Sequence, residues 1–175
     1  ICTIIIYIII APKIKKESPG PVFFSQTRVG KNGRKFKIYK FRSMTVNSEE
    51  KGARLAAKGD ARITPIGNIL RNIHFDELPQ LWNVIKGDMS FVGYRPERKF
   101  FIDQIMEHDP NYELLYNMRP GLFSMATLYN GYTDTMDKML ERLHMDLEYL
   151  YNHSLWLDIK IIFLTAISII SGKKF

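Results

Sequence analysis

The sequence predicts a compact, α-rich α+β domain with a small β-hairpin, associated with a membrane surface. Three observations lead to this fold class. A length of 175 residues suits one domain with a single core. One stretch has the pattern of a β-hairpin, whereas several others carry apolar residues at helical spacing. Both ends of the chain are strongly apolar and lie next to lysines, as helices at a membrane interface do.

The composition indicates an anionic partner. The formal net charge is +7, which suits nucleic acid, phospholipid headgroups or a phosphorylated substrate. No nucleic-acid-binding motif is present in the sequence, so no nucleic-acid partner is expected. The single cysteine, Cys2, cannot form an intrachain disulfide, and the four histidines have no zinc spacing. The sequence also lacks a P-loop and a Rossmann fingerprint.

The first element is the apolar run 1–11, which is followed by Lys13, Lys15 and Lys16. As a helix it would reach roughly 16 Å, against a hydrocarbon core of about 30 Å, so it cannot span a bilayer alone. Because the chain opens inside this run and without Met, we expect a truncated end. A buried strand rich in β-branched residues is the alternative.

A β-hairpin is expected next. Asn32 and Gly33 accept the positive φ of a tight turn, and β-forming residues flank them. Seven basic residues and no acidic one lie from Arg28 to Arg42. In a strand, Lys40 and Arg42 share a face. A solvated basic hairpin explains this pattern as well as a binding surface does.

The segment 48–60 is predicted to be a polar helix or loop that can act as a lid. A helix then begins with Thr64 as its cap and Pro65 at its first position. Arg71 lies near the end of this helix.

The pair Asp76 and Glu77 is the predicted centre of the site. Asp76 occupies an N-cap position, Glu77 lies in the first helical turn, and Gly87 ends the helix. Capping alone is one explanation of this acidic pair. Neighbouring helix residues do not face each other, so the two carboxylates cannot share a proton and must have different roles. A helix N-terminus also attracts phosphate, and a divalent cation would relieve the repulsion between phosphate and an ionised Asp76.

Residues 88–97 are predicted to form a turn, and residues 97–108 a helix. Arg95 and Arg119 each precede a proline. Together with Arg71, these arginines suit bidentate binding of phosphate, although each can also be structural.

Two helices are predicted at the C-terminal end. Met and Leu residues at helical spacing over 133–151 form a core-facing stripe rather than a metal site. The stretch from about 154 to 171 is apolar, with Trp156 near its start and lysines after it, which suits a membrane interface. Burial in the core is the alternative for this last helix.

Several short motifs occur in the order found in one family. They are Ser18-Pro-Gly-Pro-Val-Phe-Phe, Arg28-Val-Gly-Lys-Asn-Gly, Lys40-Phe-Arg-Ser-Met, Leu70-Arg71, Asp76-Glu-Leu-Pro-Gln, Lys86-Gly-Asp-Met-Ser-Phe-Val-Gly and Arg119-Pro-Gly. Over essentially its whole length, the chain resembles the bacterial sugar transferase family, the monotopic phosphoglycosyl transferases.

The resemblance implies transfer of a sugar 1-phosphate from a nucleotide diphosphosugar, commonly a UDP-sugar, to a polyprenol phosphate. It implies Mg²⁺ and a two-step course in which Asp76 is the nucleophile, forms a phosphosugar-aspartyl intermediate and contacts the metal. Glu77 would position or deprotonate partners. The residues implied to bind substrate phosphate are Lys40, Arg71, Arg42, Arg95 and Arg119.

The resemblance also implies a monotopic enzyme on the cytoplasmic face of the bacterial inner membrane, in contact with phospholipid. Residues 1–17 would be part of a re-entrant membrane helix, and residues 18–175 the catalytic domain with its interfacial helix. The oligomeric state is open, with a homodimer as one option.

Two stretches depart from the usual family pattern. Tyr94 precedes Arg95 and Pro96 where the family usually has Pro-Arg-Pro, and the stretch 122–131 replaces a commoner sequence. The sugar and nucleotide specificity are therefore open. A non-enzymatic basic module that docks on an anionic membrane or nucleic acid is the competing interpretation of the whole chain.

Overall fold

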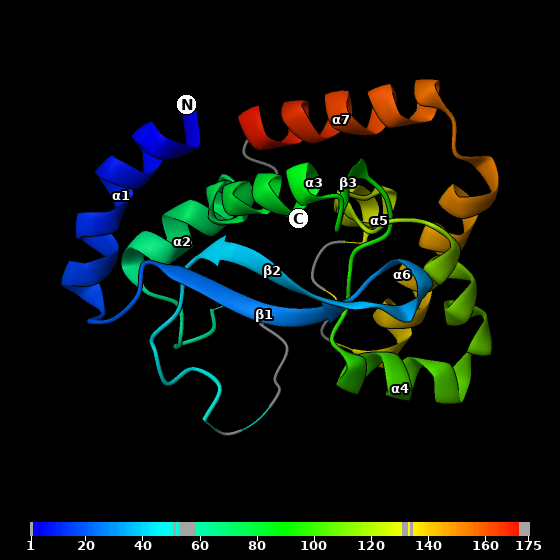
Figure 1. Ribbon diagram of the computed structural model, residues 1–175, viewed down its shortest axis with the longest axis horizontal. Coiled ribbons are helices and arrows are strands. Elements are labelled where there is room, and N and C mark those ends of the chain that lie inside the picture. Colours follow the sequence, from blue (N-terminus) through cyan, green and yellow to red (C-terminus); the bar gives the residue numbers. More distant parts are fainter. Residues whose placement is uncertain (1, 51, 53–58, 131–132, 134, 172–175) are drawn as a thin grey trace.

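The computed structural model describes residues 2–50, 52, 59–130, 133 and 135–171. A β-hairpin crosses its middle, with α1 at one end, α4 and α6 at the other, and α7 along one edge (Figure 1). The helix-rich α+β prediction is confirmed. Its elements, where η marks a 3₁₀-helix, are α1 (Cys2–Glu17), β1 (Phe23–Val29), η1 (Lys31–Gly33), β2 (Lys35–Phe41), α2 (Pro65–Asn72), η2 (Phe75–Gln80), α3 (Leu81–Lys86), β3 (Ser90–Val92), α4 (Lys99–His108), η3 (Pro110–Asn117), β4 (Gly121–Phe123), α5 (Met125–Tyr129), α6 (Met136–Asn152) and α7 (Leu155–Ile170).

The predicted hairpin is present. Strands β1 and β2 pair antiparallel, with Phe24 opposite Lys40. At the turn, Asn32 has a φ of 56° and Gly33 a φ of 68°, which are values that these two residue types accept readily. The tight turn fixes the register, so that Lys40 lies near the C-terminal end of β2.

Helix α2 begins as predicted. Thr64 Oγ1 accepts a hydrogen bond from the Gly67 backbone N–H at 3.1 Å, and Pro65 occupies the first turn. A Cβ at Gly67 would lie 2.0 Å from the Ser43 carbonyl oxygen, so only glycine lets the helix pack this closely on the segment that follows β2. This packing fixes the helix that carries Arg71 in its last turn.

The predicted N-cap at Asp76 is wrong. His74 precedes the next helix with a φ of 55°, and its carbonyl oxygen accepts the Glu77 N–H at 3.2 Å, so a 3₁₀ turn begins at Phe75. Histidine tolerates this left-handed conformation better than most residues do. Asp76 therefore lies inside η2, where capping does not occupy its carboxylate. Gly87 ends the following helix, α3, with a φ of 81°, as predicted.

Asn83 fastens α3 to the edge of β2. It is fully buried, its Oδ1 accepts the Tyr39 N–H at 3.2 Å, and its Nδ2 donates to the Lys37 carbonyl at 2.7 Å. The amide thus takes the place of a neighbouring strand, and it holds η2 and α3 against the strand that carries Lys40.

The sequence did not predict the parallel pairing of β3 with β4. Gly93 and Gly121 make it possible, because a Cβ at Gly121 would lie 2.1 Å from the Gly93 nitrogen. The Gly121 N–H also donates to the Tyr94 carbonyl at 2.9 Å. This contact holds the segment that carries Arg95. The predicted helix from residue 97 begins at Lys99 instead.

The core has three clusters, formed around α1 and β2, around α4 and α6, and around α7. Residues 2–17 are helical, so the strand alternative for the N-terminal run is wrong. The predicted stripe on α6 is confirmed, since Met139, Leu143 and Leu147 are buried. Most of the predicted lid at 48–60 lies outside the described residues.

Helix α7 is neither buried nor long enough to cross a membrane. Only one face packs inward through Ile161, whereas Leu155, Trp156 and Phe163 are 77%, 81% and 63% exposed. Among the helices that the structure describes, none has the length and apolar composition of a membrane span. The alternative prediction, that this helix is buried in the core, is therefore wrong for its outer face.

Candidate active site

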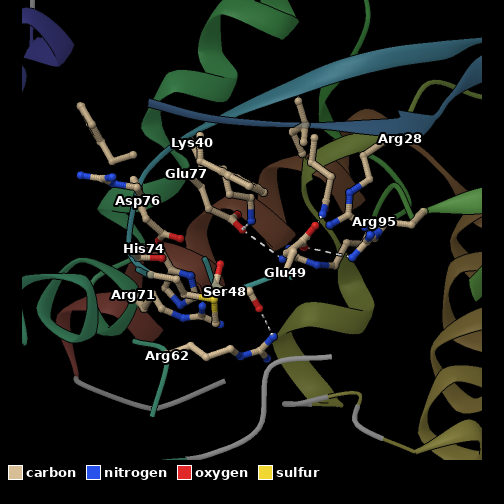
Figure 2. Close-up of a pocket in the computed structure, with 18 of the residues that line it drawn as sticks. Arg28, Lys40, Ser48, Glu49, Arg62, Arg71, His74, Asp76, Glu77 and Arg95 are labelled. Carbon is tan, nitrogen blue, oxygen red and sulfur yellow. Dashed lines mark hydrogen bonds and ion pairs between the residues drawn. The ribbon is translucent and has the colours of Figure 1, made fainter. Parts of the chain in front are cut away.

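A cavity of about 440 Å³ lies between the hairpin, α2, η2, the segment 95–98 and α6 (Figure 2). Its lining is strongly cationic. Among the described residues, eight arginines and lysines line it against four carboxylates. The cations are Arg28, Lys40, Arg42, Arg62, Arg71, Arg95, Arg98 and Arg142, and the carboxylates are Glu49, Asp76, Glu77 and Glu97. Such an excess of positive charge suits a ligand that carries several negative charges.

Asp76 lies in the wall of this cavity. Asp76 is 7% exposed, and no described residue donates a hydrogen bond to its carboxylate. Burial raises the pKa of Asp76; Lys40 opposes this effect and Glu77 adds to it. A buried carboxylate without a hydrogen-bond donor is uncommon and costly. The protein alone leaves this charge poorly compensated.

Glu77 has the opposite environment. Its Oε1 lies 2.5 Å from Lys40 Nζ and 3.0 Å from Arg95 Nη2 and forms an ion pair with each. Burial alone would raise the pKa of Glu77, but Lys40 and Arg95 outweigh it and hold the pKa well below its usual range. Glu77 therefore stays ionised and fixes the positions of both cations.

Arg71 and His74 complete the surroundings of Asp76. Arg71 lines the cavity near Asp76, and no ion pair joins it to a carboxylate within the described part of the chain. Its guanidinium is therefore available to a ligand. Burial lowers the pKa of His74, with Glu77 and Asp76 opposing. His74 is consequently neutral at pH 7.

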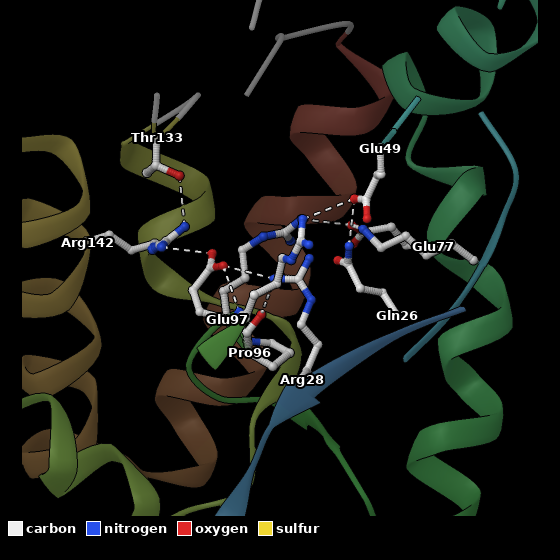
Figure 3. Close-up of polar contacts among 11 residues, drawn as sticks. Gln26, Arg28, Glu49, Glu77, Pro96, Glu97, Thr133 and Arg142 are labelled. Atoms are coloured by element: carbon white, nitrogen blue, oxygen red, sulfur yellow. Dashed lines mark hydrogen bonds and ion pairs between the residues drawn. The ribbon is translucent and has the colours of Figure 1, made fainter. Parts of the chain in front are cut away.

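A second ionic group lies across the cavity, centred on Glu97 (Figure 3). Glu97 Oε2 is 2.9 Å from Arg28 Nη1, and its Oε1 is 2.9 Å from Arg142 Nη2. Arg142 also donates to Thr133 Oγ1 at 2.8 Å. Burial raises the pKa of Glu97, but Arg142 and Arg28 outweigh it and lower the pKa to about 2. The group ties the hairpin to α6.

Glu49 contacts the wall of the cavity from the segment that follows β2. Its Oε1 accepts hydrogen bonds from Gln26 Nε2 at 2.8 Å and from Arg98 Nη1 at 3.1 Å. Ser48 and Glu49 are the described residues of the predicted lid segment that line the cavity.

The structure brings five of the seven predicted site residues close to one another. Lys40, Arg71, Asp76, Glu77 and Arg95 surround one part of the cavity. Arg42 also lines it, but this guanidinium donates to the carbonyls of Ser18 and Pro19 and so holds the chain after α1. Arg119 is exposed and is not among the described lining residues.

Comparison with known proteins identifies the family. The model of a family described as bacterial sugar transferase matches residues 1–172. The chain belongs to this family. A UDP-N-acetylgalactosamine-undecaprenyl-phosphate N-acetylgalactosaminephosphotransferase of Aeromonas hydrophila is 48% identical over 159 residues, which cover 91% of this chain and 38% of the relative.

Two further relatives of the sugar transferase family differ in length. A UDP-glucose:undecaprenyl-phosphate glucose-1-phosphate transferase of Escherichia coli (strain K12) is 44% identical over 90% of this chain and 34% of its own length. The exopolysaccharide production protein PSS of Rhizobium leguminosarum bv. phaseoli is 43% identical over 95% of this chain and 86% of its own. The chain thus spans about a third of the longer relatives.

Sequence reasoning missed four residues that build the site: Arg28, His74, Glu97 and Arg142. The sequence pattern marks Arg28 only as one of the basic residues of the hairpin. The position of His74, two residues before Asp76, was the available signal for it. Glu97 lies 69 residues from Arg28 in the chain, and no local pattern marks such a pair.

Proposed function

We propose that this protein transfers a sugar 1-phosphate from a UDP-sugar to a polyprenol phosphate through an aspartyl intermediate. The relatives' names specify a UDP-sugar and undecaprenyl phosphate as the substrates of those proteins. The observation that carries the proposal here is the contrast between two adjacent carboxylates. Glu77 forms ion pairs with two cations. Asp76, in contrast, faces a cationic cavity, and its carboxylate has no hydrogen-bond donor among the described residues.

In the first step, an Asp76 carboxylate oxygen attacks the phosphorus that carries the sugar. The phosphoanhydride bond breaks, UMP leaves with the bond's electron pair, and an acyl phosphate joins Asp76 to the sugar phosphate. Burial makes the ionised carboxylate more basic and strips it of water, and both effects favour attack. Arg71, which has no ion-pair partner among the described residues, and the fixed Lys40 and Arg95 stabilise the negative charge that develops on the phosphoryl oxygens.

In the second step, a phosphate oxygen of the acceptor attacks the same phosphorus. The acyl phosphate bond breaks, Asp76 leaves as a carboxylate, and the polyprenol diphosphosugar forms. Splitting the transfer lets one set of cations serve both steps, because donor and acceptor each bring a phosphate to the same place. Glu77 acts mainly as a positioning group for Lys40 and Arg95.

The residues at the cavity fit a Mg²⁺ ion that the substrate helps to hold. No three His, Cys, Asp or Glu side chains of the described chain are grouped to bind a metal by themselves. Mg²⁺, however, commonly binds through one or two carboxylates, substrate phosphates and several waters. Asp76 is the carboxylate that would hold it. Bound Mg²⁺ would neutralise charge on the donor diphosphate.

The exposed apolar side chains support attachment to a membrane from one side. Tyr7, Ile8 and Ile9 on α1 are exposed, as are Trp156 and Phe163 on α7. In Figure 1, α7 lies along the upper edge of the molecule, and α1 begins near this edge and runs down the left side. A polyprenol phosphate carries its phosphate at such a surface, so we place the enzyme on phospholipid at the cytoplasmic face of the inner membrane. A homodimer stays a prediction.

The competing interpretation, a basic docking module, is not favoured. Docking needs surface cations, but it does not need a buried carboxylate without a hydrogen-bond donor in the wall of a cavity. Nor does it need the ion pairs that hold Lys40 and Arg95 beside Asp76.

Release of UMP tests the proposal. Purified protein in detergent with Mg²⁺ and a panel of UDP-sugars, without acceptor, should release at most one UMP per protein from the correct donor. Addition of undecaprenyl phosphate should then give continuous release and a lipid-linked diphosphosugar. Absence of UMP with every donor, even with acceptor present, would overturn the proposal. Release that requires acceptor from the first turnover would favour direct transfer instead.

A further inference from the structure

A second, smaller cavity of about 120 Å³ lies between η2, β4, the start of α5, and α7. Its lining is mainly apolar. The side chains that matter for its character are Ile73, Phe75, Leu78, Leu122, Phe123 and Ile169. Unlike the large cavity, it has no arginine or lysine among its described lining residues. We name it the apolar groove.

The apolar groove adjoins the cationic cavity. His74, Glu77 and Thr127 line both. They are polar, and they form the border that the two spaces share. A ligand with an apolar segment attached directly to a phosphate matches the character of both spaces, with its phosphate in the cationic cavity and its apolar segment in the groove. A nucleotide sugar has no such segment, so the donor does not explain the groove.

We propose that the apolar groove binds the isoprene carbons next to the phosphate of the polyprenol phosphate acceptor. This inference rests on the proposed function and extends it, because it assigns an acceptor subsite to residues outside the phosphate-binding cluster. The volume holds only the first part of the chain. Helix α7 closes the groove through Thr165 and Ile169 and exposes apolar side chains on its other face, which gives the rest of the chain an apolar surface to follow.

The assignment makes α7 part of acceptor selection. Its inner face would contact the acceptor, whereas its outer face would contact lipid. Ile169 is half-buried at the groove, and Ile167 on the same helix is 45% exposed. Substitutions at these two positions therefore form a matched pair, two residues apart on one helix.

The test separates donor chemistry from acceptor binding. Ile169→Trp fills the groove, and Ile167→Trp is the control. Exchange of labelled UMP into the UDP-sugar, measured without acceptor, should be the same in both variants and the original protein. The KM for undecaprenyl phosphate should rise about 10- to 200-fold in Ile169→Trp alone, the range expected for a misfit in an apolar pocket. An acceptor KM that is equal in both variants would overturn the inference.

Photo-crosslinking provides a measurement without any substitution. A prenyl phosphate with a diazirine on its first isoprene unit should label Ile169, Leu122 or Phe123 in the original protein. Labelling confined to the outer face of α7 or to α1 would overturn the acceptor subsite. Loss of UMP exchange in the original protein would instead overturn the proposed function itself, so the two failures are distinguishable.

Discussion

Two carboxylates of the same cavity, Glu97 and Asp76, are buried to a similar extent but differ in their partners. Glu97 is 5% exposed and Asp76 7%. Arg28 and Arg142 contact both oxygens of Glu97, and its pKa falls to about 2 in spite of burial. Burial raises the pKa of Asp76, and no described residue donates a hydrogen bond to it. Burial alone therefore does not distinguish the proposed nucleophile from Glu97, whereas the missing hydrogen-bond donor does.

Replacement of Asp76 should have the largest effect. Asp76→Asn removes the nucleophile, so UMP release should fall by about a thousandfold or more. The free energy of unfolding should stay the same or rise, because a poorly compensated buried charge is lost. Activity assays and urea titrations on one preparation measure both effects. Activity within tenfold of the original protein would show that Asp76 is not the nucleophile.

Glu97→Gln should have the opposite effect on stability. It leaves Arg28 and Arg142 buried without their carboxylate, which costs about 3–5 kcal/mol of stability at pH 7. The exposed Glu113→Gln should change stability by less than about 0.5 kcal/mol. The lowered pKa of Glu97 gives stability that is present above about pH 4.5 and is lost as the pH falls toward 2. Unchanged stability of the Glu97→Gln variant would contradict the difference that we draw between Glu97 and Asp76.

A third buried carboxylate, Asp146, sharpens the comparison. It is 2% exposed, its Oδ1 has no hydrogen-bond partner, and it is not among the described residues that line the cavity. Burial raises its pKa to about 7, while Arg142 and the Arg95 backbone N–H oppose this effect. A raised pKa thus marks a nucleophile only where a substrate can reach the group.

Because this pKa is raised above the unfolded value, the stability that Asp146 contributes is complete below about pH 4 and is lost as the pH rises through 7. Between pH 5 and pH 8 the original protein should lose about 2–3 kcal/mol relative to Asp146→Asn. Urea titrations across this range measure the difference. The same pH dependence in both proteins would contradict the assignment.

Glu77→Gln should have the smallest effect. Lys40 and Arg95 would lose the charge that fixes them, and misplaced catalytic groups cost about 10- to 100-fold in rate. The repulsion that raises the pKa of Asp76 would also disappear. The acid limb of the pH profile for UMP release should therefore shift to lower pH. A profile that keeps its position, or an Asp76-like loss of activity, would assign Glu77 a different role.

Local patterns predicted the hairpin turn, the start of α2, the end of α3 and the stripe on α6. Each depends on residue types close in the chain, such as Asn32 with Gly33. The short strands β3 and β4 carry no periodic signal, and two glycines far apart in sequence allow their pairing. The N-cap prediction for Asp76 failed because His74 adopts a left-handed conformation that the sequence does not require.

For the site, sequence motifs supplied the residues but not their environments. Asp76 and Glu77 are adjacent, yet they differ because cations from β2 and from the segment after β3 contact only Glu77. Arg42 was grouped with Lys40 by strand alternation, but β2 ends before it and its guanidinium packs against the chain after α1. The Glu97 group joins distant segments, so only folding reveals it.

The most direct test of the aspartyl intermediate is the mass of the protein after reaction with donor alone. The protein is mixed with Mg²⁺ and its UDP-sugar, quenched rapidly, digested and sequenced by mass spectrometry. We predict one added sugar phosphate on the peptide that contains Asp76, formed with one equivalent of UMP and removed by undecaprenyl phosphate. An unmodified Asp76 peptide during UMP release, or an adduct on another residue, would contradict the account.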